Sequence, residues 1–174
     1  MDDLTDLLTR ALAATPPESP AAAGAREALA HGEYEVALGL LAEPADGRRP
    51  PPDWWDLLIG AADLMRLRPV AAWCRWGRWE SVHGVLRASL GLTAGGPIPG
   101  RGIARVRWDI GRDDPRAARI WVEYAPSLAP GSTGSVRLAP LTPADWRGLR
   151  PGRQITIDEH PHLAGTATIL ETVP

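Results

Sequence analysis

The sequence lacks three residue types altogether: it has no lysine, no asparagine and no phenylalanine in its 174 residues. The codons of all three are AT-rich, so their absence indicates a GC-rich bacterial genome and not a physical selection. The 19 arginines are therefore not by themselves a sign of anion recognition. The absence of lysine does exclude some chemistry, because a Walker-type phosphate loop, pyridoxal phosphate binding and Schiff-base catalysis each require one.

Other features are scarce or absent. A single cysteine, Cys74, excludes an internal disulfide and any zinc site built from several cysteines. No apolar run reaches the roughly 18 to 20 residues of a membrane span. The sequence starts Met1-Asp2-Asp3, which is acidic where a secretory signal would be basic. We expect a cytoplasmic protein without membrane contact, and the 44% apolar and 23% charged residues are typical of a globular one.

The net charge of −2 is unevenly distributed along the chain. Residues 1–66 carry 12 acidic residues and five arginines, which gives −7, whereas residues 67–174 carry nine acidic residues and 14 arginines, which gives +5. Such asymmetry favours two structural units. It leaves two alternatives: the halves attract each other, or each half meets a different partner.

The first half has the apolar spacing of helices. The leucines from Leu4 to Leu12 recur at helical spacing until Pro16-Pro17. Ser19-Pro20 is typical of a helix start, and Gly32 is suited to end that helix after His31. A third helix is expected over about 33–43, followed by a proline-rich loop over 44–52. Asp53 is expected to cap a fourth helix that reaches about Leu67.

The second half has the two-residue alternation of half-buried strands. Apolar and polar residues alternate over about 82–92, 104–110 and 120–124, and shorter or less regular strands are expected around 136–138, 155–157 and 165–173. Clusters of glycine and proline separate these segments. Six short alternating strands indicate an antiparallel barrel or sandwich with one solvent-exposed face.

Together these patterns predict an α+β protein with an N-terminal bundle of about four helices and a six-stranded antiparallel β-barrel. The expected domains are a helical one at 1–67 and a barrel at 81–174. Residues 68–80 contain Trp73, Trp76 and Trp79 at helical spacing, but Gly77 lies between them. We therefore expect this stretch to be a connector.

The helical half resembles the small MafI-type bacterial immunity proteins. The resemblance covers about residues 1–67 and rests on a helix that ends in His-Gly-Glu-Tyr and leads into an Ala-Leu-rich helix. The matching residues are His31, Gly32, Glu33, Tyr34, Ala37 and Leu38. It implies a cytoplasmic antidote that binds one toxin of a polymorphic or contact-dependent system.

The end of the chain resembles the C-terminal β-barrel of elongation factor Tu and its stand-alone bacterial relatives. Glu159, Gly165 and Ile169 match that family, whereas His160 and Ala167 replace two of its glycines. The similarity is concentrated in the last forty residues. It implies a barrel fold, and GTP hydrolysis does not carry over because the GTPase domain is absent.

No residue pattern indicates catalysis, a metal or a cofactor. His160 and His162 share a turn but lack converging ligands for a metal. Cys74 lies between tryptophans, which favours a buried side chain over a nucleophile. The Gly131–Gly134 segment lacks the helix that a phosphate loop requires. Arg101, Arg105 and Arg107, beside Trp108, favour a solvated strand face, so we do not expect nucleic-acid binding.

The acidic helical half is the most suggestive feature, because clustered carboxylates complement the basic clefts of toxins that attack nucleic acids. We expect a non-catalytic immunity protein that neutralises a cognate toxin. The candidate toxin-binding residues are Glu33, Tyr34, Glu35, Asp56 and Asp63. The alternative is that the barrel is the working part, an elongation-factor-like module that contacts translation machinery or another protein. A small enzyme that uses His31 or His162 is a third possibility.

Overall fold

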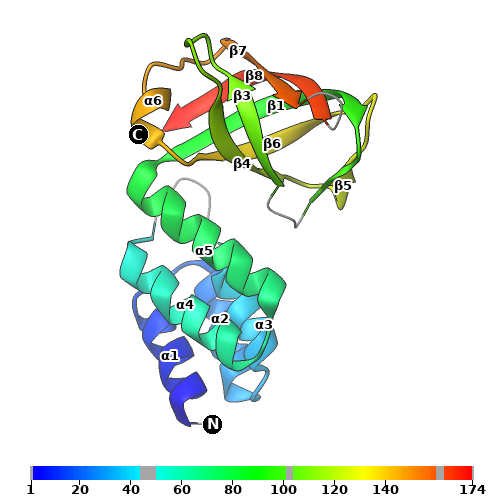
Figure 1. Ribbon diagram of the computed structural model, residues 1–174. Helices are drawn as coiled ribbons and strands as arrows, with labels where there is room; N and C mark the ends of the chain where they lie inside the picture. The colour runs from blue at the N-terminus through cyan, green and yellow to red at the C-terminus, as the bar shows by residue number, and fades with distance from the viewer. Residues whose placement is uncertain (1, 44–49, 101–103, 160–162, 174) are drawn as a thin grey trace. The chain divides into compact units, whose positions relative to one another are not determined.

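The computed structural model describes residues 2–43, 50–100, 104–159 and 163–173, and the chain divides into two compact units (Figure 1). The helical unit covers Met1–Val82 and the barrel unit covers His83–Pro174. With this boundary the helical unit holds 13 acidic residues and eight arginines, a net charge of −5. The barrel unit holds eight acidic residues and 11 arginines, a net charge of +3. The charge asymmetry predicted from the sequence therefore follows the structural division.

The described residues of the helical unit form five helices, one more than the bundle of about four that we predicted. They are α1 (Asp2–Ala13), α2 (Pro20–Ala30), α3 (Tyr34–Leu41), α4 (Pro52–Leu64) and α5 (Arg68–His83). Each of the five contributes buried side chains to one core, including Leu8, Ala25, Leu38, Leu58 and Cys74. The proline-rich loop expected at 44–52 lies largely outside the described residues.

The ends of the helices follow local sequence signals in most places. The Ser19 hydroxyl accepts a hydrogen bond from the backbone N–H of Ala22 at 3.0 Å, which caps α2 as predicted. Gly32 then adopts a φ of +75°, a left-handed conformation that glycine takes without strain and that ends α2. The prediction for Asp53 was wrong, because α4 already begins at Pro52 and Asp53 lies in its first turn.

The fifth helix is where we expected a connector. Residues 68–80 belong to α5, and its Ala71 and Cys74 are fully buried in the helical core. Gly77 is required at the contact with α4, since a Cβ atom there would lie 2.5 Å from the Trp55 ring. Gly77, which we took as evidence against a helix, thus makes room on α5 for the ring of Trp55.

Tryptophan N–H groups hold the helical unit together. Trp54 Nε1 donates to the carbonyl oxygen of Ala11 at 2.9 Å, and Trp73 Nε1 donates to that of Ala42 at 2.7 Å. Trp55 Nε1 donates to Ser81 Oγ at 2.9 Å. In a chain without phenylalanine, these rings supply both the apolar bulk of the core and its cross-helix hydrogen bonds.

The barrel unit contains a closed antiparallel barrel of six strands in the spatial order β1-β6-β4-β3-β7-β8. The strands are β1 (Val85–Gly95), β3 (Ala104–Asp109), β4 (Arg116–Val122), β6 (Thr133–Pro140), β7 (Gln154–Glu159) and β8 (Leu163–Val173). Two short strands, β2 (Ile98–Pro99) and β5 (Ser127–Leu128), pair separately. The prediction of a six-stranded antiparallel barrel is confirmed, although β1 starts at Val85 because Val82 and His83 belong to α5.

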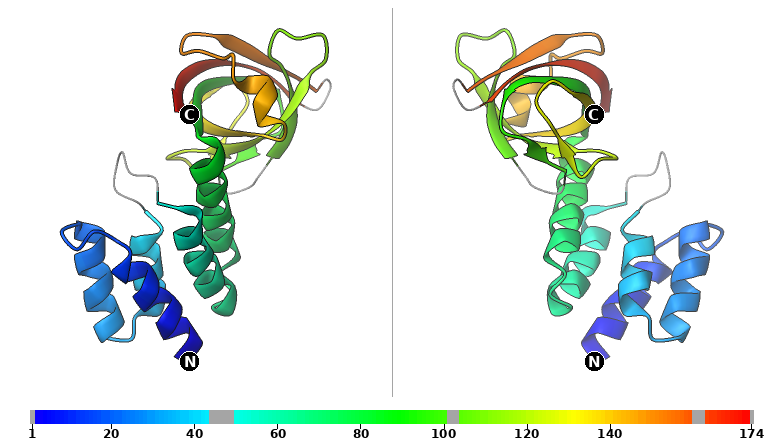
Figure 2. Two further views of the ribbon diagram at one scale, coloured as in Figure 1. Left: turned by 90° about the vertical axis from the view of Figure 1, so that its left-hand side faces the viewer. Right: turned by 90° about the vertical axis from the view of Figure 1, so that its right-hand side faces the viewer.

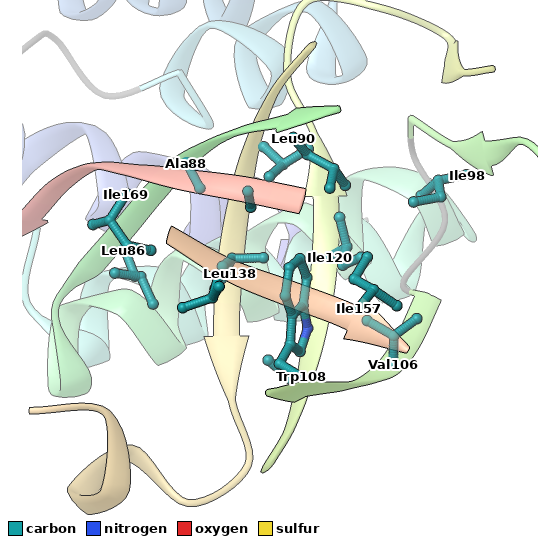
Figure 3. Packing of buried hydrophobic residues seen from close by; sticks show 14 of the residues in the cluster. Leu86, Ala88, Leu90, Ile98, Val106, Trp108, Ile120, Leu138, Ile157 and Ile169 are labelled. Atoms are coloured by element: carbon teal, nitrogen blue, oxygen red, sulfur yellow. The ribbon is translucent and has the colours of Figure 1, made fainter. Parts of the chain in front are cut away.

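The inward-facing side chains fill the barrel (Figure 3). Leu86, Ala88, Leu90 and Leu92 alternate with outward residues along β1, as the sequence pattern predicted. Trp108 is the largest of the fully buried side chains. The short helix α6 (Pro143–Trp146) lies at one end of the barrel in Figure 2, and its Trp146 belongs to the barrel core. None of the helices in the described part of the chain is long and apolar enough to cross a membrane.

Candidate functional site

The five candidate residues all lie on the helical unit, but the structure separates them into two groups. Asp56 and Asp63 project from α4 toward arginines of α5. Arg78 Nε lies 2.6 Å from Asp56 Oδ1, and Arg75 Nη2 lies 2.7 Å from Asp63 Oδ2. The pKa of Arg78 is raised by its hydrogen bond to Asp56 and by the charge of that carboxylate. Each of these two carboxylates therefore already has an arginine partner within the chain.

Glu33 and Glu35 form the second group, together with Tyr34. Glu33 precedes α3 and Glu35 lies in its first turn, where both side chains are exposed. Within the described residues neither carboxylate has an ion-pair partner. Tyr34 packs against the helical core, and its hydroxyl accepts a hydrogen bond from Thr5 Oγ1 at 3.3 Å. The α2–α3 junction therefore exposes two carboxylates, and the packed side chain of Tyr34 between them attaches the junction to the helical core.

The junction has a fixed geometry. Beyond the left-handed Gly32, the backbone N–H of Glu33 donates to the carbonyl oxygen of Ala28 at 2.8 Å. His31, which was considered as a catalytic residue, is exposed, and its Nδ1 lies 2.9 Å from the carbonyl oxygen of Glu27. The backbone N–H of His31 donates to the same carbonyl oxygen at 3.2 Å, so the side chain makes a local contact at the helix end.

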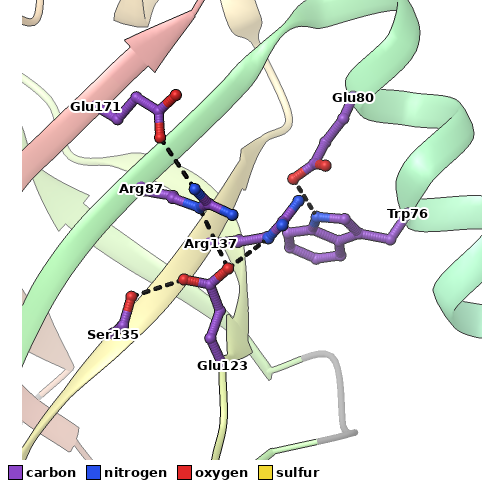
Figure 4. Close-up of polar contacts among 7 residues, drawn as sticks. All are labelled: Trp76, Glu80, Arg87, Glu123, Ser135, Arg137 and Glu171. Carbon is purple, nitrogen blue, oxygen red and sulfur yellow. Dashed lines mark hydrogen bonds and ion pairs between the residues drawn. The ribbon is translucent and has the colours of Figure 1, made fainter. Parts of the chain in front are cut away.

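A second polar cluster lies on the outer face of the barrel and was not predicted (Figure 4). The Glu123 carboxylate, only 6% exposed, lies 2.7 Å from Arg137 Nε and 3.2 Å from Arg87 Nε. It also accepts a hydrogen bond from Ser135 Oγ at 2.6 Å, and Arg87 Nη1 lies 3.1 Å from Glu171 Oε2. The antiparallel register joins these residues, because Arg87 is opposite both Arg137 and Glu171.

The cluster shifts the ionisation of Glu123. Burial acts to raise the pKa of this carboxyl, but the hydrogen bonds from Ser135 and Arg137 and the charges of Arg137 and Arg87 outweigh it and lower the pKa. Glu123 is therefore ionised at neutral pH. The network links strands β1, β6 and β8 with the end of β4 on the barrel surface.

The helical unit also contains a buried carboxylate. Glu80 of α5 is 6% exposed, and its Oε1 accepts a hydrogen bond from Trp76 Nε1 at 2.8 Å (Figure 4). The two residues are one helical turn apart. This pairing satisfies one more of the tryptophan N–H groups.

The next candidates are the metal site and the phosphate-binding loop that were considered from the sequence. The described residues contain no group of three or more His, Cys, Asp and Glu side chains able to hold a metal ion. His160 and His162 lie outside the described residues, as does Arg101. Gly131-Ser132 forms the turn into β6, where Ser132 Oγ donates to the carbonyl oxygen of Ala129, and not a phosphate-binding loop.

Cys74 provides a direct test of the helical core. Its thiol is fully buried, and burial raises its pKa to about 12. At pH 8 only about one thiol in ten thousand is ionised, so we expect no reaction with Ellman's reagent over an hour in the folded protein. The control is the same protein in 6 M guanidinium chloride, where one equivalent should react within minutes. Stoichiometric labelling of the folded chain would contradict the buried position of Cys74.

Two arginines that were considered for nucleic-acid binding, Arg105 and Arg107, are exposed. Arg105 and Arg107 are outward residues of β3, and Arg105 lies directly opposite Arg119 of β4. Like charges in register weaken a strand pair slightly, by a few tenths of a kcal/mol. This arrangement is compatible with a solvated strand face, which was the interpretation from the sequence.

Comparison with known proteins adds no family assignment: neither the family models nor the curated proteins match this sequence. The function must therefore be argued from the residues themselves. Glu33 and Glu35 at the α2–α3 junction are the candidate carboxylates that have no ion-pair partner among the described residues.

Proposed function

We propose that the protein is a non-catalytic immunity protein whose helical unit binds and neutralises a cognate bacterial toxin. The observation that carries this proposal is the hydrogen-bonded α2–α3 junction, whose carboxylates Glu33 and Glu35 have no ion-pair partner among the described residues. The resemblance of residues 31–38 to MafI-type immunity proteins supports the same assignment. A toxin that acts on nucleic acid presents basic groups to its substrate, and free carboxylates complement such a surface.

Of the five candidate residues, we assign toxin contact to Glu33, Tyr34 and Glu35. Asp56 and Asp63 already have arginine partners at 2.6–2.7 Å. A toxin arginine would have to displace Arg78 or Arg75 to reach them, and would replace one exposed ion pair with another at little net gain in energy. Binding at the α2–α3 junction meets no such competition.

The test is co-expression of the chain with the toxin encoded by the neighbouring gene. Wild type should restore growth, and the purified proteins should form a complex. In the double variant Glu33→Gln/Glu35→Gln, the association rate should fall about tenfold at low salt, because two steering charges are lost. Stopped-flow fluorescence at two salt concentrations measures this, and the difference should vanish at high salt.

Two further variants make the result specific. Asp113→Asn/Asp114→Asn removes two exposed carboxylates from the barrel unit and should leave the rate unchanged. No rescue and no complex with wild type would refute the immunity function. Equal rates for wild type and the Glu33/Glu35 variant would remove those residues from the interface.

The barrel-module alternative rests on one observation of its own. Tyr124 is 90% exposed and adopts a φ of 60°, a strained conformation for a residue other than glycine. An exposed aromatic side chain on such a backbone suits a protein contact. If Tyr124→Ala abolished the complex and the Glu33/Glu35 variant did not, the barrel would be the binding unit.

A further inference from the structure

Helix α3 has a second face that the fold covers only in part, with Leu40 lying against Gly24 of α2. Its inner face buries Ala37, Leu38 and Leu41 in the helical core. The opposite face carries Val36, Gly39 and Leu40, which are spaced i, i+3 and i+4 and are all exposed, and the exposed Glu43 follows two residues after the helix ends. Val36 is 51% exposed and Leu40 37%. Residues at this spacing lie in one row on the helix surface.

Gly39 lies between the two apolar side chains, and the fold gives no reason for a glycine there. It is within a regular helix without a positive φ, and nothing lies within 4 Å of the position that its Cβ would occupy. A glycine inside a helix destabilises it relative to alanine. Gly77, by contrast, is explained by the Trp55 ring. A glycine on an open helix surface allows another protein to approach the backbone closely.

Charge identifies the kind of partner that fits. The row lacks arginine, and it is flanked by Glu35 and by Glu43 at its end, both exposed and without an ion-pair partner in the described residues. A surface that is apolar along its centre and acidic at its edge complements an apolar patch edged by lysine and arginine. Nucleic acid would be repelled by these carboxylates.

We propose that Val36, Gly39 and Leu40 form the centre of the toxin-binding surface. The toxin places an apolar side chain against the open backbone at Gly39 and its basic residues against Glu35 and Glu43. This assignment rests on the proposed immunity function and specifies its partner's chemistry. It also predicts opposite effects of one substitution on stability and on binding.

The decisive variant is Gly39→Ala in the full chain. The added methyl group should raise the melting temperature by a few degrees, because alanine favours the helix and the position is open. The same methyl group should weaken the complex with the toxin at least tenfold, since it occupies the space into which the toxin packs. Circular dichroism measures the first effect and isothermal titration calorimetry the second.

Matched controls separate a local contact from a general effect. Gly148→Ala, at another open glycine without a positive φ, should leave the affinity unchanged. Val36→Ser should weaken binding about tenfold, whereas Leu64→Ser, at an exposed leucine of α4, should not.

The outcomes distinguish the two proposals. Wild type that does not bind the toxin overturns the immunity function and this surface with it. Wild type that binds, with Gly39→Ala and Val36→Ser binding equally well, overturns the surface alone and leaves the function standing.

Discussion

Replacing Trp55 with alanine is expected to lower the free energy of unfolding of the helical unit by about 3–5 kcal/mol, the usual range for removing a buried tryptophan. Trp55 is 2% exposed, and its ring lies edge-on to Trp54 with the ring centroids 4.9 Å apart. Its N–H also donates to Ser81, so the variant loses a link between α4 and α5. Hydrogen exchange of the full chain, followed by mass spectrometry, should show lost protection in peptides from α4 and α5.

Two milder variants separate the contribution of the Trp55 hydrogen bond from that of its packing. Trp55→Phe keeps an aromatic ring but loses the hydrogen bond to Ser81, and should cost about 1–2 kcal/mol. Gly77→Ala keeps Trp55 and adds a Cβ atom 2.5 Å from its ring, which should cost about 1–3 kcal/mol through overpacking. Unchanged protection of α4 and α5 in Trp55→Ala would contradict the packing described here.

The contact between Trp55 and Gly77 explains why α5 was not predicted from the sequence. Sequence periodicity registers the spacing of Trp73, Trp76 and Trp79 but cannot show which residue a glycine must accommodate. Trp55 lies 22 residues before Gly77, and only the packed fold reveals that the missing side chain makes room for its ring. Helices α1 to α3 needed no such information, because leucine spacing, Ser19 and Gly32 are local signals.

The barrel strands were also predictable from local sequence signals. The alternation along β1 and β3 depends only on which face each residue occupies, and the sequence displays this directly. Strand order and register depend on distant pairings that the sequence does not display. The Glu123 cluster depends on these pairings, since Arg87, Arg137 and Glu171 meet only in the antiparallel register.

The candidate site was predictable in part. The exposed positions of Glu33 and Glu35 followed from the helix break at Gly32. The arginine partners of Asp56 and Asp63 did not, because they belong to a segment that we had assigned to a connector. Because α5 was not predicted, the unpaired negative charge on the surface of α4 was overestimated.

Replacing Glu123 with glutamine should lower the free energy of unfolding of the barrel by about 2–3 kcal/mol at pH 7. Breaking a fully buried ion pair costs more, about 3–5 kcal/mol. Here Arg137 is 17% exposed and Arg87 31%, so water partly solvates the arginines left behind. Chemical denaturation, with hydrogen exchange of β4 and β6 to localise the loss, measures the change.

The pH dependence gives this prediction a signature that a packing defect lacks. The pKa of Glu123 is lower in the folded protein than in the unfolded chain, so the carboxylate stabilises the fold above the ordinary glutamate pKa of about 4.3. That stabilisation disappears as the pH falls through the lowered folded pKa. The difference between wild type and Glu123→Gln should therefore be constant near neutrality and shrink below about pH 4. Glu171→Gln is the control, because its carboxylate is 43% exposed and pairs with Arg87 alone among the described residues, so its loss should cost under about 1 kcal/mol. A difference for Glu123→Gln that persisted unchanged at low pH would mean that its shape, and not its charge, stabilises the barrel.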